Sequence, residues 1–253
     1  LRLKSSSRLK DARHIARLCC EEKFDIIHAH CSHSLTLALI SRLLYRAPKI
    51  VASRRVDFHV KKPIVGAFKY KTKLVDKIIC VSDAIKNIMI SDGVPAQKLV
   101  TVRSGVDLHK FDDDDPAGLR EEFSIPDDHL IFVTVAALVG HKDYPTLLRA
   151  ARIVLEQTKK VTFLAVGNGP NENALTELAN ELGVTENFKF VGYRKDVGRF
   201  LKLADVFVLA SKTEGLGTSL LDAGATNCAI VATRAGGIPE IVKNGDTGLL
   251  VPT

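Results

Sequence analysis

The sequence predicts an α/β protein made of two doubly wound domains. Short apolar runs rich in β-branched residues recur along the 253-residue chain, and helical or turn sequence follows each of them. In the helical stretches the apolar residues recur at intervals of three and four. Near-continuous apolar strands that alternate with helices are typical of parallel sheets covered on both faces. One polar stretch interrupts this alternation and divides the chain in two.

The expected elements follow in order along the chain. The first half contains strands at 24–29, 49–53, 77–82 and 99–103. The second half contains strands at 131–137, 161–166, 188–191, 206–209, 229–232 and 248–251. The clearest helices are expected at 7–23, 144–157 and 171–182. Ligands of such sheets bind at the carboxyl ends of the strands, so we expect the chemistry in the loops that follow the strands.

The polar stretch at 105–116 contains four consecutive aspartates. These acids lack the loop spacing of an EF-hand, so we interpret the stretch as a solvated linker rather than a calcium site. The resulting division is a first domain at 1–107, a linker at 108–126 and a second domain at 127–253. Because the chain opens without Met and stops directly after an apolar run, we expect it to be incomplete at both ends.

Charge is divided unevenly between the halves. Residues 1–110 carry 22 Lys or Arg and 9 Asp or Glu, a net charge of +13, whereas residues 111–253 have a net charge of −6. The basic half is therefore expected to face phospholipid headgroups, a phosphorylated acceptor or nucleic acid. Nucleic acid is disfavoured because no helix-turn-helix, zinc-finger or ribonucleoprotein motif accompanies the charge.

The densest basic patch mixes lysines with aromatic residues. Such a patch suits an interfacial contact with an anionic membrane, although a solvated helix face explains it equally well. Its members are Phe58, Lys61, Lys62, Phe68, Lys69, Tyr70, Lys71 and Lys73.

Several sequence features indicate the compartment. No apolar run reaches the roughly 18 residues that a membrane span needs, and the basic opening lacks the apolar core of a secretory leader. The five cysteines show no framework spacing, which favours reduced thiols. We therefore expect a cytoplasmic protein. Peripheral attachment to the inner face of the cell membrane is the alternative that the basic patch leaves open.

The strongest candidate site follows the strand at 206–209. Gly215 and Gly217 permit a close approach of the backbone, and the helix after them begins with free N–H groups that suit a diphosphate. Glu214 and Asp222 are eight residues apart, the first before this helix and the second about one turn inside it. Both can then face one cleft, at either end of a nucleotide sugar. A capped helix with two exposed acids is the alternative.

Two other ligand classes are disfavoured because their glycine motifs are incomplete. Gly167 and Gly169 follow a strand, but the third position of the dinucleotide fingerprint holds Glu172 instead of Gly or Ala. This counts against a nicotinamide dehydrogenase. The phosphate loop that ends in Gly-Lys-Ser or Gly-Lys-Thr is absent as well, which counts against an NTPase.

A histidine-rich segment follows the first strand, with His28 and His30 on one side of the strand end and Cys31 and His33 in the loop after it. A zinc site would need a second pair of ligands at suitable spacing, and the sequence has none. We therefore expect no metal. The histidines are expected to line a cleft, with His30 toward an acceptor, and a satisfied core histidine is the alternative for His28.

Ordered motifs along the chain are similar to those of a known family. In the second half they are VGYR at 191–194, EGLG at 214–217, AGGIPE at 235–240 and GDTGLLVP at 245–252. In the first half they are DIIHAH at 25–30, VS at 81–82 and SGVD at 104–107. Together they resemble a family-4, retaining glycosyltransferase of the GT-B fold. Each motif alone is weak, whereas the ordered set is specific and covers nearly the whole chain.

The resemblance implies two Rossmann-like domains that face a cleft, with a nucleotide-diphosphate sugar bound by the second. Glu214 would contact sugar hydroxyls, Asp222 the ribose diol, and Lys142 the leaving phosphate. The remaining implied contacts are backbone amides of Gly215, Leu216, Gly217 and Thr218 to the diphosphate and sugar, Tyr193 and Arg194 near the nucleobase, and His30 and Arg55 on the acceptor side.

The implied chemistry needs few protein groups. In retaining enzymes of this type the departing phosphate is thought to deprotonate the acceptor, so no protein base, metal or cofactor is required. This would explain why the sequence offers no nucleophile–His–Asp set. Catalysis would depend on positioning and on stabilising the charge of the leaving group.

Three positions depart from the family pattern. Ala137 stands where the family usually has an arginine that holds phosphate, and His141 or Arg234 would have to substitute for it. Asp222 is one methylene shorter than the usual glutamate. Arg55 lies in an Arg-Arg pair where the family commonly has a histidine, and an arginine cannot act as a base.

The sequence thus predicts a metal-independent hexosyltransferase that acts with retention on a lipid-linked or polysaccharide acceptor, in the biosynthesis of lipopolysaccharide or surface polysaccharide. The departures keep open a degenerate module that binds nucleotide sugars without turnover. A sugar-nucleotide epimerase of the same architecture is the third hypothesis.

Overall fold

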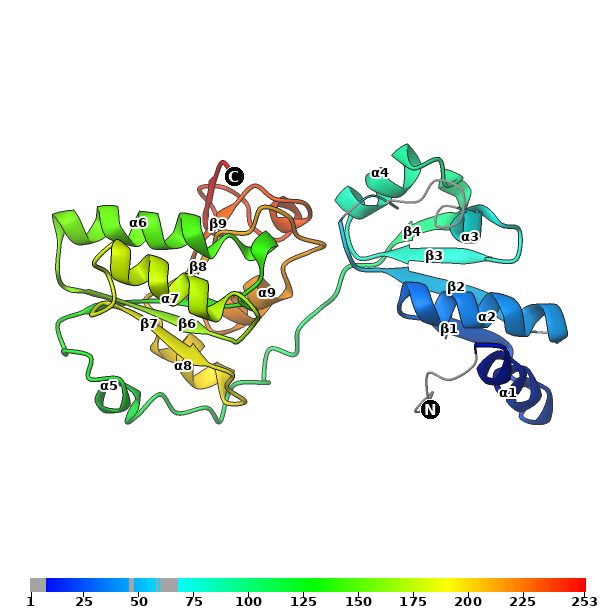
Figure 1. Ribbon diagram of the computed structural model, residues 1–253, viewed down its shortest axis with the longest axis horizontal. Coiled ribbons are helices and arrows are strands. Elements are labelled where there is room, and N and C mark those ends of the chain that lie inside the picture. Colours follow the sequence, from blue (N-terminus) through cyan, green and yellow to red (C-terminus); the bar gives the residue numbers. More distant parts are fainter. Residues whose placement is uncertain (1–7, 46–47, 58, 60–67) are drawn as a thin grey trace. The chain divides into compact units, whose positions relative to one another are not determined.

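The computed structural model describes residues 8–45, 48–57, 59 and 68–253. The chain divides into two compact units, Leu1–Arg103 and Ser104–Thr253, close to the boundary predicted at residue 107. Each unit is built on a parallel sheet flanked by helices (Figure 1). All ten predicted strands form, with bounds that shift by a few residues. The predicted α/β fold with two doubly wound, Rossmann-like domains is confirmed.

The first unit has a four-stranded parallel sheet in the order β1-β2-β3-β4. Helix α1 packs on α2 through small buried side chains, among them Ala12, Ala16 and Ala38. Cys31 caps α2, because its sulfur accepts from the backbone N–H of Ser34. The elements are α1 (Arg8–Glu21), β1 (Ile26–Ala29), α2 (Ser32–Leu44), β2 (Lys49–Arg54), α3 (Phe68–Lys71), β3 (Lys77–Cys80), α4 (Asp83–Ser91), η1 (Ala96–Lys98) and β4 (Leu99–Thr101).

The second unit has a six-stranded parallel sheet in the order β10-β9-β8-β5-β6-β7. Its elements begin with α5 (Leu119–Glu122), β5 (Leu130–Val135), η2 (Gly140–Lys142), α6 (Tyr144–Gln157), β6 (Val161–Val166) and α7 (Glu172–Glu181). They continue with β7 (Phe188–Gly192), α8 (Val197–Leu203), β8 (Val206–Leu209), α9 (Thr218–Ala225), β9 (Ala229–Thr233), η3 (Ile238–Glu240) and β10 (Leu249–Val251).

Both faces of this second sheet are buried. Alternate residues of one strand separate onto the two faces: Ile131 and Val133 pack with α5 and α8, whereas Phe132 packs with α6 and α7 (Figure 1). Strand β6 is buried along its whole length. A strand covered on both faces reads as a continuous apolar run, which is why the sequence pattern located it well.

The strand order reverses next to β5. From β5 the chain adds β6 and β7 on one side, and then returns to add β8, β9 and β10 on the other. The loops that follow β5 and β8 therefore leave neighbouring strands in different directions, and such switch points are where open α/β sheets bind ligands.

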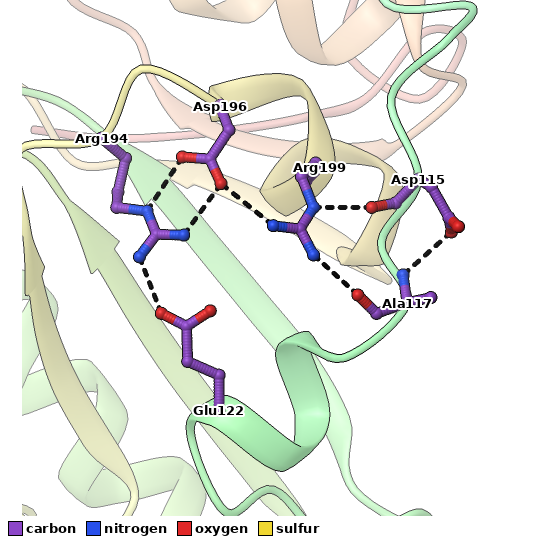
Figure 2. A network of polar contacts seen from close by, with 6 residues as sticks. All are labelled: Asp115, Ala117, Glu122, Arg194, Asp196 and Arg199. Atoms are coloured by element: carbon purple, nitrogen blue, oxygen red, sulfur yellow. Dashed lines mark hydrogen bonds and ion pairs between the residues drawn. The ribbon is translucent and has the colours of Figure 1, made fainter.

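The stretch predicted as a solvated linker, 105–116, is exposed along most of its length, but it is also fixed to α8. Phe111 is buried, and a Cβ built on Gly198 would lie 1.9 Å from a carboxylate oxygen of Asp114. Arg199 donates to the carbonyl oxygens of Asp115 and Ala117, both at 2.6 Å (Figure 2). Polar composition did not reveal this docking, since the backbone carbonyls are satisfied by an arginine far along the chain.

A second set of contacts in Figure 2 centres on Asp196, which precedes α8. Arg194 forms a bidentate ion pair with Asp196, with Nε donating to Oδ1 at 2.9 Å and Nη2 to Oδ2 at 2.8 Å. Its Nη1 also donates to Oε1 of Glu122 at 2.7 Å. Hydrogen bonding from Arg194 lowers the pKa of Asp196 to about 2. The same contacts raise the pKa of the Arg194 guanidinium.

This network predicts acid sensitivity. Because the folded pKa of Asp196 lies below its unfolded value, its stabilisation is present above about pH 4 and is lost as the pH falls toward 2. Asp196→Asn is expected to lower the free energy of unfolding by about 1–2 kcal/mol at pH 7 and to flatten the loss between pH 4 and 2. Urea unfolding at several pH values measures this. Asp246→Asn, at an exposed turn, is the control, and equal acid dependence in both variants would contradict the assignment.

Within the ranges that the structure describes, no helix combines the length and the apolar character needed to cross a membrane.

Candidate functional site

The candidate site lies where the strand order of the second sheet reverses. Strands β5 and β8 are direct neighbours, with Phe132 paired to Val206 and Val133 to Phe207. The loop after β5 carries Lys142, and the loop after β8 carries Glu214. The parallel strands therefore bring two residues that are far apart in sequence to one edge of the sheet.

Lys142 and Glu214 form an ion pair, Nζ to Oε1. Their side chains are only 17% and 10% exposed. The hydroxyl of Ser211 donates to the same carboxylate oxygen at 2.9 Å. Removing one member of a pair this secluded leaves an uncompensated charge, so the geometry of each side chain depends on the other. The structure thus brings together the two residues that were predicted to act on the reaction.

Glycine makes room for the backbone of Glu214. Gly236 has a φ of +49°, and a Cβ built there would lie 1.8 Å from the carbonyl oxygen of Glu214. The N–H of Gly237 donates to that same oxygen at 3.1 Å. The second glycine pair in the sequence is therefore part of the site, since it fixes the loop that carries the acid.

The predicted diphosphate-binding segment lies at the start of α9. Gly217 is its N-cap, with a φ of +81°, and carries no side chain that could cover the first turn. Gly215, Leu216 and Gly217 are buried, whereas Thr218 is exposed. The predicted order of loop, glycine cap and helix is present.

Asp222 forms a separate ion pair. It lies inside α9, and Lys110 Nζ contacts its Oδ1 at 3.1 Å. The same ammonium lies 4.6 Å from the centroid of the Phe111 ring. Glu214 and Asp222 are thus each matched by a lysine. Lys110 lies in the segment that the sequence predicts to be a linker, and nothing in the sequence pattern indicated that it would pair with Asp222.

The two residues predicted near the nucleobase follow β7. Tyr193 is 68% exposed. Asp196 and Glu122 accept hydrogen bonds from the guanidinium of Arg194 (Figure 2). The same guanidinium lies 5.1 Å from the ring centroid of Phe200. The side chain of Arg194 therefore holds α5 and α8 together.

The departures from the family pattern have clear positions. Ala137 is exposed in the loop after β5, as is His141 near the end of that loop. Arg234 is exposed after β9, and its backbone N–H donates to Val251. The candidate site thus has Lys142 where the family pattern has a lysine and the methyl group of Ala137 where the pattern has an arginine.

The predicted acceptor-side residues lie at the carboxyl ends of β1 and β2 in the first unit. His28 and His30 are both exposed, with ring centroids 4.0 Å apart, and His28 Nε2 lies 2.8 Å from the hydroxyl of Ser53. Partial burial and then the charge of His30 lower the pKa of His28. The alternative of a core histidine at 28 is therefore wrong. The part of the chain that the structure describes contains no group of three His, Cys, Asp or Glu residues able to hold a metal ion.

The two arginines at the end of β2 differ in burial. Arg55 is exposed, whereas Arg54 is only 7% exposed and lies 5.9 Å from the ring centroid of Tyr70. Lys69 Nζ lies 5.9 Å from the centroid of the same Tyr70 ring and donates to the backbone oxygen and the hydroxyl of Ser32 at the start of α2. Three cationic side chains and two histidines thus belong to the elements at one end of this sheet.

The predicted basic patch is described only in part. Phe58, Lys61 and Lys62 lie outside the described residues. Phe68 is 67% exposed, whereas Tyr70 is 3% exposed and belongs to the core. Alternation in the sequence did not distinguish the two, because they lie on different sides of the short helix α3.

Similar solved structures define the class of fold. HepE from Anabaena, solved in complex with UDP, matches with a TM-score of 0.83 and 21% identity over 95% of this chain and 68% of its own. A glycosyltransferase from Rickettsia africae ESF-5 matches with a TM-score of 0.81 and 19% identity over 100% of this chain and 69% of its own. The protein has the two-domain GT-B fold.

Family models then identify the chain itself. Residues 117–253 match the model described as glycosyl transferases group 1, and residues 2–110 match glycosyltransferase family 4. The chain belongs to the group 1 glycosyltransferases and is a family-4 glycosyltransferase of the GT-B fold.

Curated relatives extend beyond this chain. The N-acetyl-alpha-D-glucosaminyl L-malate synthase of Bacillus anthracis is 27% identical over 94% of this chain and 64% of its own length. The UDP-Gal:alpha-D-GlcNAc-diphosphoundecaprenol alpha-1,3-galactosyltransferase of Escherichia coli is 27% identical over 96% of this chain and 66% of its own. The chain thus spans just under two thirds of the length of these relatives.

Proposed function

We propose that the protein transfers a hexosyl unit from a nucleotide-diphosphate sugar to a lipid-linked or polysaccharide acceptor, with retention at the anomeric carbon. The observation that carries the proposal is the secluded Lys142–Glu214 pair at the switch point of the second sheet. A lysine in a poorly hydrated site suits the developing charge of a leaving diphosphate. A carboxylate beside it suits the hydroxyls of a sugar.

In the proposed reaction the bond between the anomeric carbon and the diphosphate oxygen breaks as the bond to the acceptor oxygen forms. The acceptor proton passes to the departing phosphate on the same face, so the protein supplies no base. The chain's residues bind and orient: Lys142 neutralises the leaving group, Glu214 holds the sugar, and Asp222 holds the ribose. The proposal includes no metal and no cofactor.

The donor must compete with a contact that is already formed. Glu214 forms an ion pair with Lys142 in the structure. A diphosphate that binds Lys142 weakens this ion pair. Glu214→Gln is therefore expected to tighten the binding of the free nucleoside diphosphate on the order of 5-fold, because the neutral amide holds the lysine less firmly, while it lowers sugar transfer. Calorimetric titration with UDP and GDP, beside a transfer assay, measures both. Weaker binding in the variant would contradict the competition.

Charge and relatives support an anionic acceptor. The first unit gathers Arg54, Arg55 and Lys69 near one end of its sheet, beside His28 and His30. The Escherichia coli relative has a diphosphoundecaprenol acceptor in its name, and a Rhizobium meliloti relative, 30% identical over 52% of this chain, is named for lipopolysaccharide core biosynthesis. We therefore propose a phosphate-bearing or membrane-held acceptor, met at the cytoplasmic face of the membrane.

The test is a transfer assay with the full reading frame and a panel of UDP- and GDP-sugars. Acceptors are offered as polyprenyl diphosphate sugars in anionic vesicles and as soluble oligosaccharides. We expect a product with retained anomeric configuration from one donor class, and higher turnover with the vesicle-held acceptor. Absence of transfer and of donor hydrolysis with every donor would refute the proposal.

Ala137 favours a second candidate function. Because the loop after β5 lacks one phosphate-binding cation, a protein that binds nucleotide sugars without turnover is consistent with the site. Saturable UDP or GDP binding in a full-length protein that shows no transfer would establish this candidate.

A further inference from the structure

Lys212 contacts the residues on both sides of Lys142. Its backbone N–H donates to the carbonyl oxygen of His141 at 2.8 Å. Its side-chain Nζ lies 3.0 Å from Oδ1 of Asp143. Lys212 belongs to the loop after β8, two residues before Glu214. Lys212, in the loop that carries Glu214, thus contacts the loop that carries Lys142 at the residues immediately before and immediately after Lys142.

Asp143 is held in place by its backbone conformation, its burial and its hydrogen bonds. It adopts the left-handed backbone region, with φ 48° and ψ 45°, which costs a residue with a side chain about 1–2 kcal/mol. Its side chain is 8% exposed and accepts from the hydroxyl of Thr146 at 2.7 Å as well as from Lys212. Burial raises the pKa of this carboxyl, but the hydrogen bonds from Thr146 and Lys212 together lower it overall.

The loop of Lys212 is itself anchored from the other side. The hydroxyl of Thr233, at the end of β9, donates to the carbonyl oxygen of Ser211 at 2.5 Å. The hydroxyl of Ser211 points to Glu214. The positions of Lys142 and Glu214 therefore depend on a chain of contacts that crosses from β9 through the loop of β8 to the loop of β5.

We propose that Lys212 is a positioning residue, which clamps the loop of Lys142 to the loop of Glu214 while a donor is bound. The proposal rests on the proposed function, because it assigns Lys142 to the diphosphate. When the diphosphate takes Lys142, the direct Lys142–Glu214 contact between the loops weakens. The two contacts of Lys212 involve neither reacting side chain, so they persist and keep the loops in register.

Three variants test the clamp: Lys212→Met, Asp143→Asn and the double variant. We expect each single variant to lower kcat about 10-fold with little change in the KM for the donor, because a loop displacement well under 1 Å already misplaces a catalytic group. The double variant is expected to be no worse than either single variant, since both remove one contact. Lys212→Arg is expected to restore most of kcat, because a guanidinium can reach the same carboxylate.

Thr146→Val is the matched control. It removes the other hydrogen bond to the Asp143 carboxylate but leaves both contacts of Lys212 in place. If the role of Asp143 is only to stabilise the start of α6, Thr146→Val will lower kcat as much as Asp143→Asn does. We expect its kcat to stay within about 2-fold of the parent.

Hydrogen exchange separates this inference from the proposed function. Lys212→Met and Asp143→Asn are expected to speed amide exchange at 138–143 and 210–217, whereas Thr146→Val changes only the first turn of α6. Absence of turnover in the parent protein would refute the proposed function and leave this exchange pattern intact. Unchanged exchange in Lys212→Met would overturn the clamp. A loss of kcat in Lys212→Met but not in Asp143→Asn would also overturn it, because Lys212 would then contact the donor directly.

Discussion

Replacement of Lys142 by methionine is expected to lower kcat for sugar transfer by at least about 100-fold, the usual effect of removing one preorganised group that stabilises a leaving charge. The lysine is 17% exposed, so water cannot replace it well. Because Ala137 stands where the family pattern has a second cation, the loss falls on a loop that already lacks one positive charge. Steady-state kinetics with the preferred donor measure the change.

The replacement of Lys142 by methionine also leaves the carboxylate of Glu214 without the cation with which it pairs. Glu214 is 10% exposed, and breaking a secluded pair from one side typically costs about 3–5 kcal/mol. The double variant Lys142→Met with Glu214→Gln separates the two effects, since it is expected to recover stability without recovering transfer. Lys159→Met, at an exposed position before β6, is the control for loss of a lysine. A Lys142→Met protein that folds and retains more than a tenth of the parent kcat would contradict the assigned role.

Gly236→Ala is expected to lower kcat for sugar transfer about 100-fold by displacing Glu214. An alanine there adds a Cβ that would lie 1.8 Å from the Glu214 carbonyl oxygen, so the backbone of the acidic loop must move. Left-handed backbone adds about 1–2 kcal/mol of strain for any residue with a Cβ. A displacement near 1 Å at a catalytic group reduces rate about 100-fold. Donor kinetics and thermal unfolding of the variant measure the two consequences.

Gly245→Ala separates strain from displacement. Gly245 also has a positive φ, +79°, but a Cβ there meets no heavy atom within 4 Å. We expect this variant to lose the same increment of stability and to keep the parent kcat. Equal activity of the two variants would show that the approach of Gly236 to Glu214 does not position the acid.

The alternation of strands and helices could be predicted because it is a local property of the chain. Strand β6 is buried on both faces and appears as a continuous apolar run, and α6 shows the three-and-four spacing of a helix that buries one side. The segments that form the candidate site could also be located in the sequence. Glycines at 215, 217, 236 and 237 and an acid at 214 have recognisable spacing, and the resemblance assigned the lysine.

Other features could not be predicted because they depend on partners far along the chain. Composition predicted a solvated linker at 105–116 and did not reveal that Phe111 is buried or that Arg199 holds the segment. The Arg-Arg pair at the end of β2 did not show which arginine is buried. The basic patch predicted from the sequence includes Tyr70, although the side chain of Tyr70 is buried in the core.

The amino-acid sequence by itself determined the order of the elements, the parallel character of the sheets and the loops in which we propose that the chemistry lies. Only the tertiary structure decided which side chains meet, because the strand order places residues 72 positions apart, Lys142 and Glu214, on adjacent loops. The contacts of Lys212 with the neighbours of Lys142 follow from the same pairing of β5 with β8. Periodicity defines the face on which a residue lies, whereas its partner depends on which strands are neighbours.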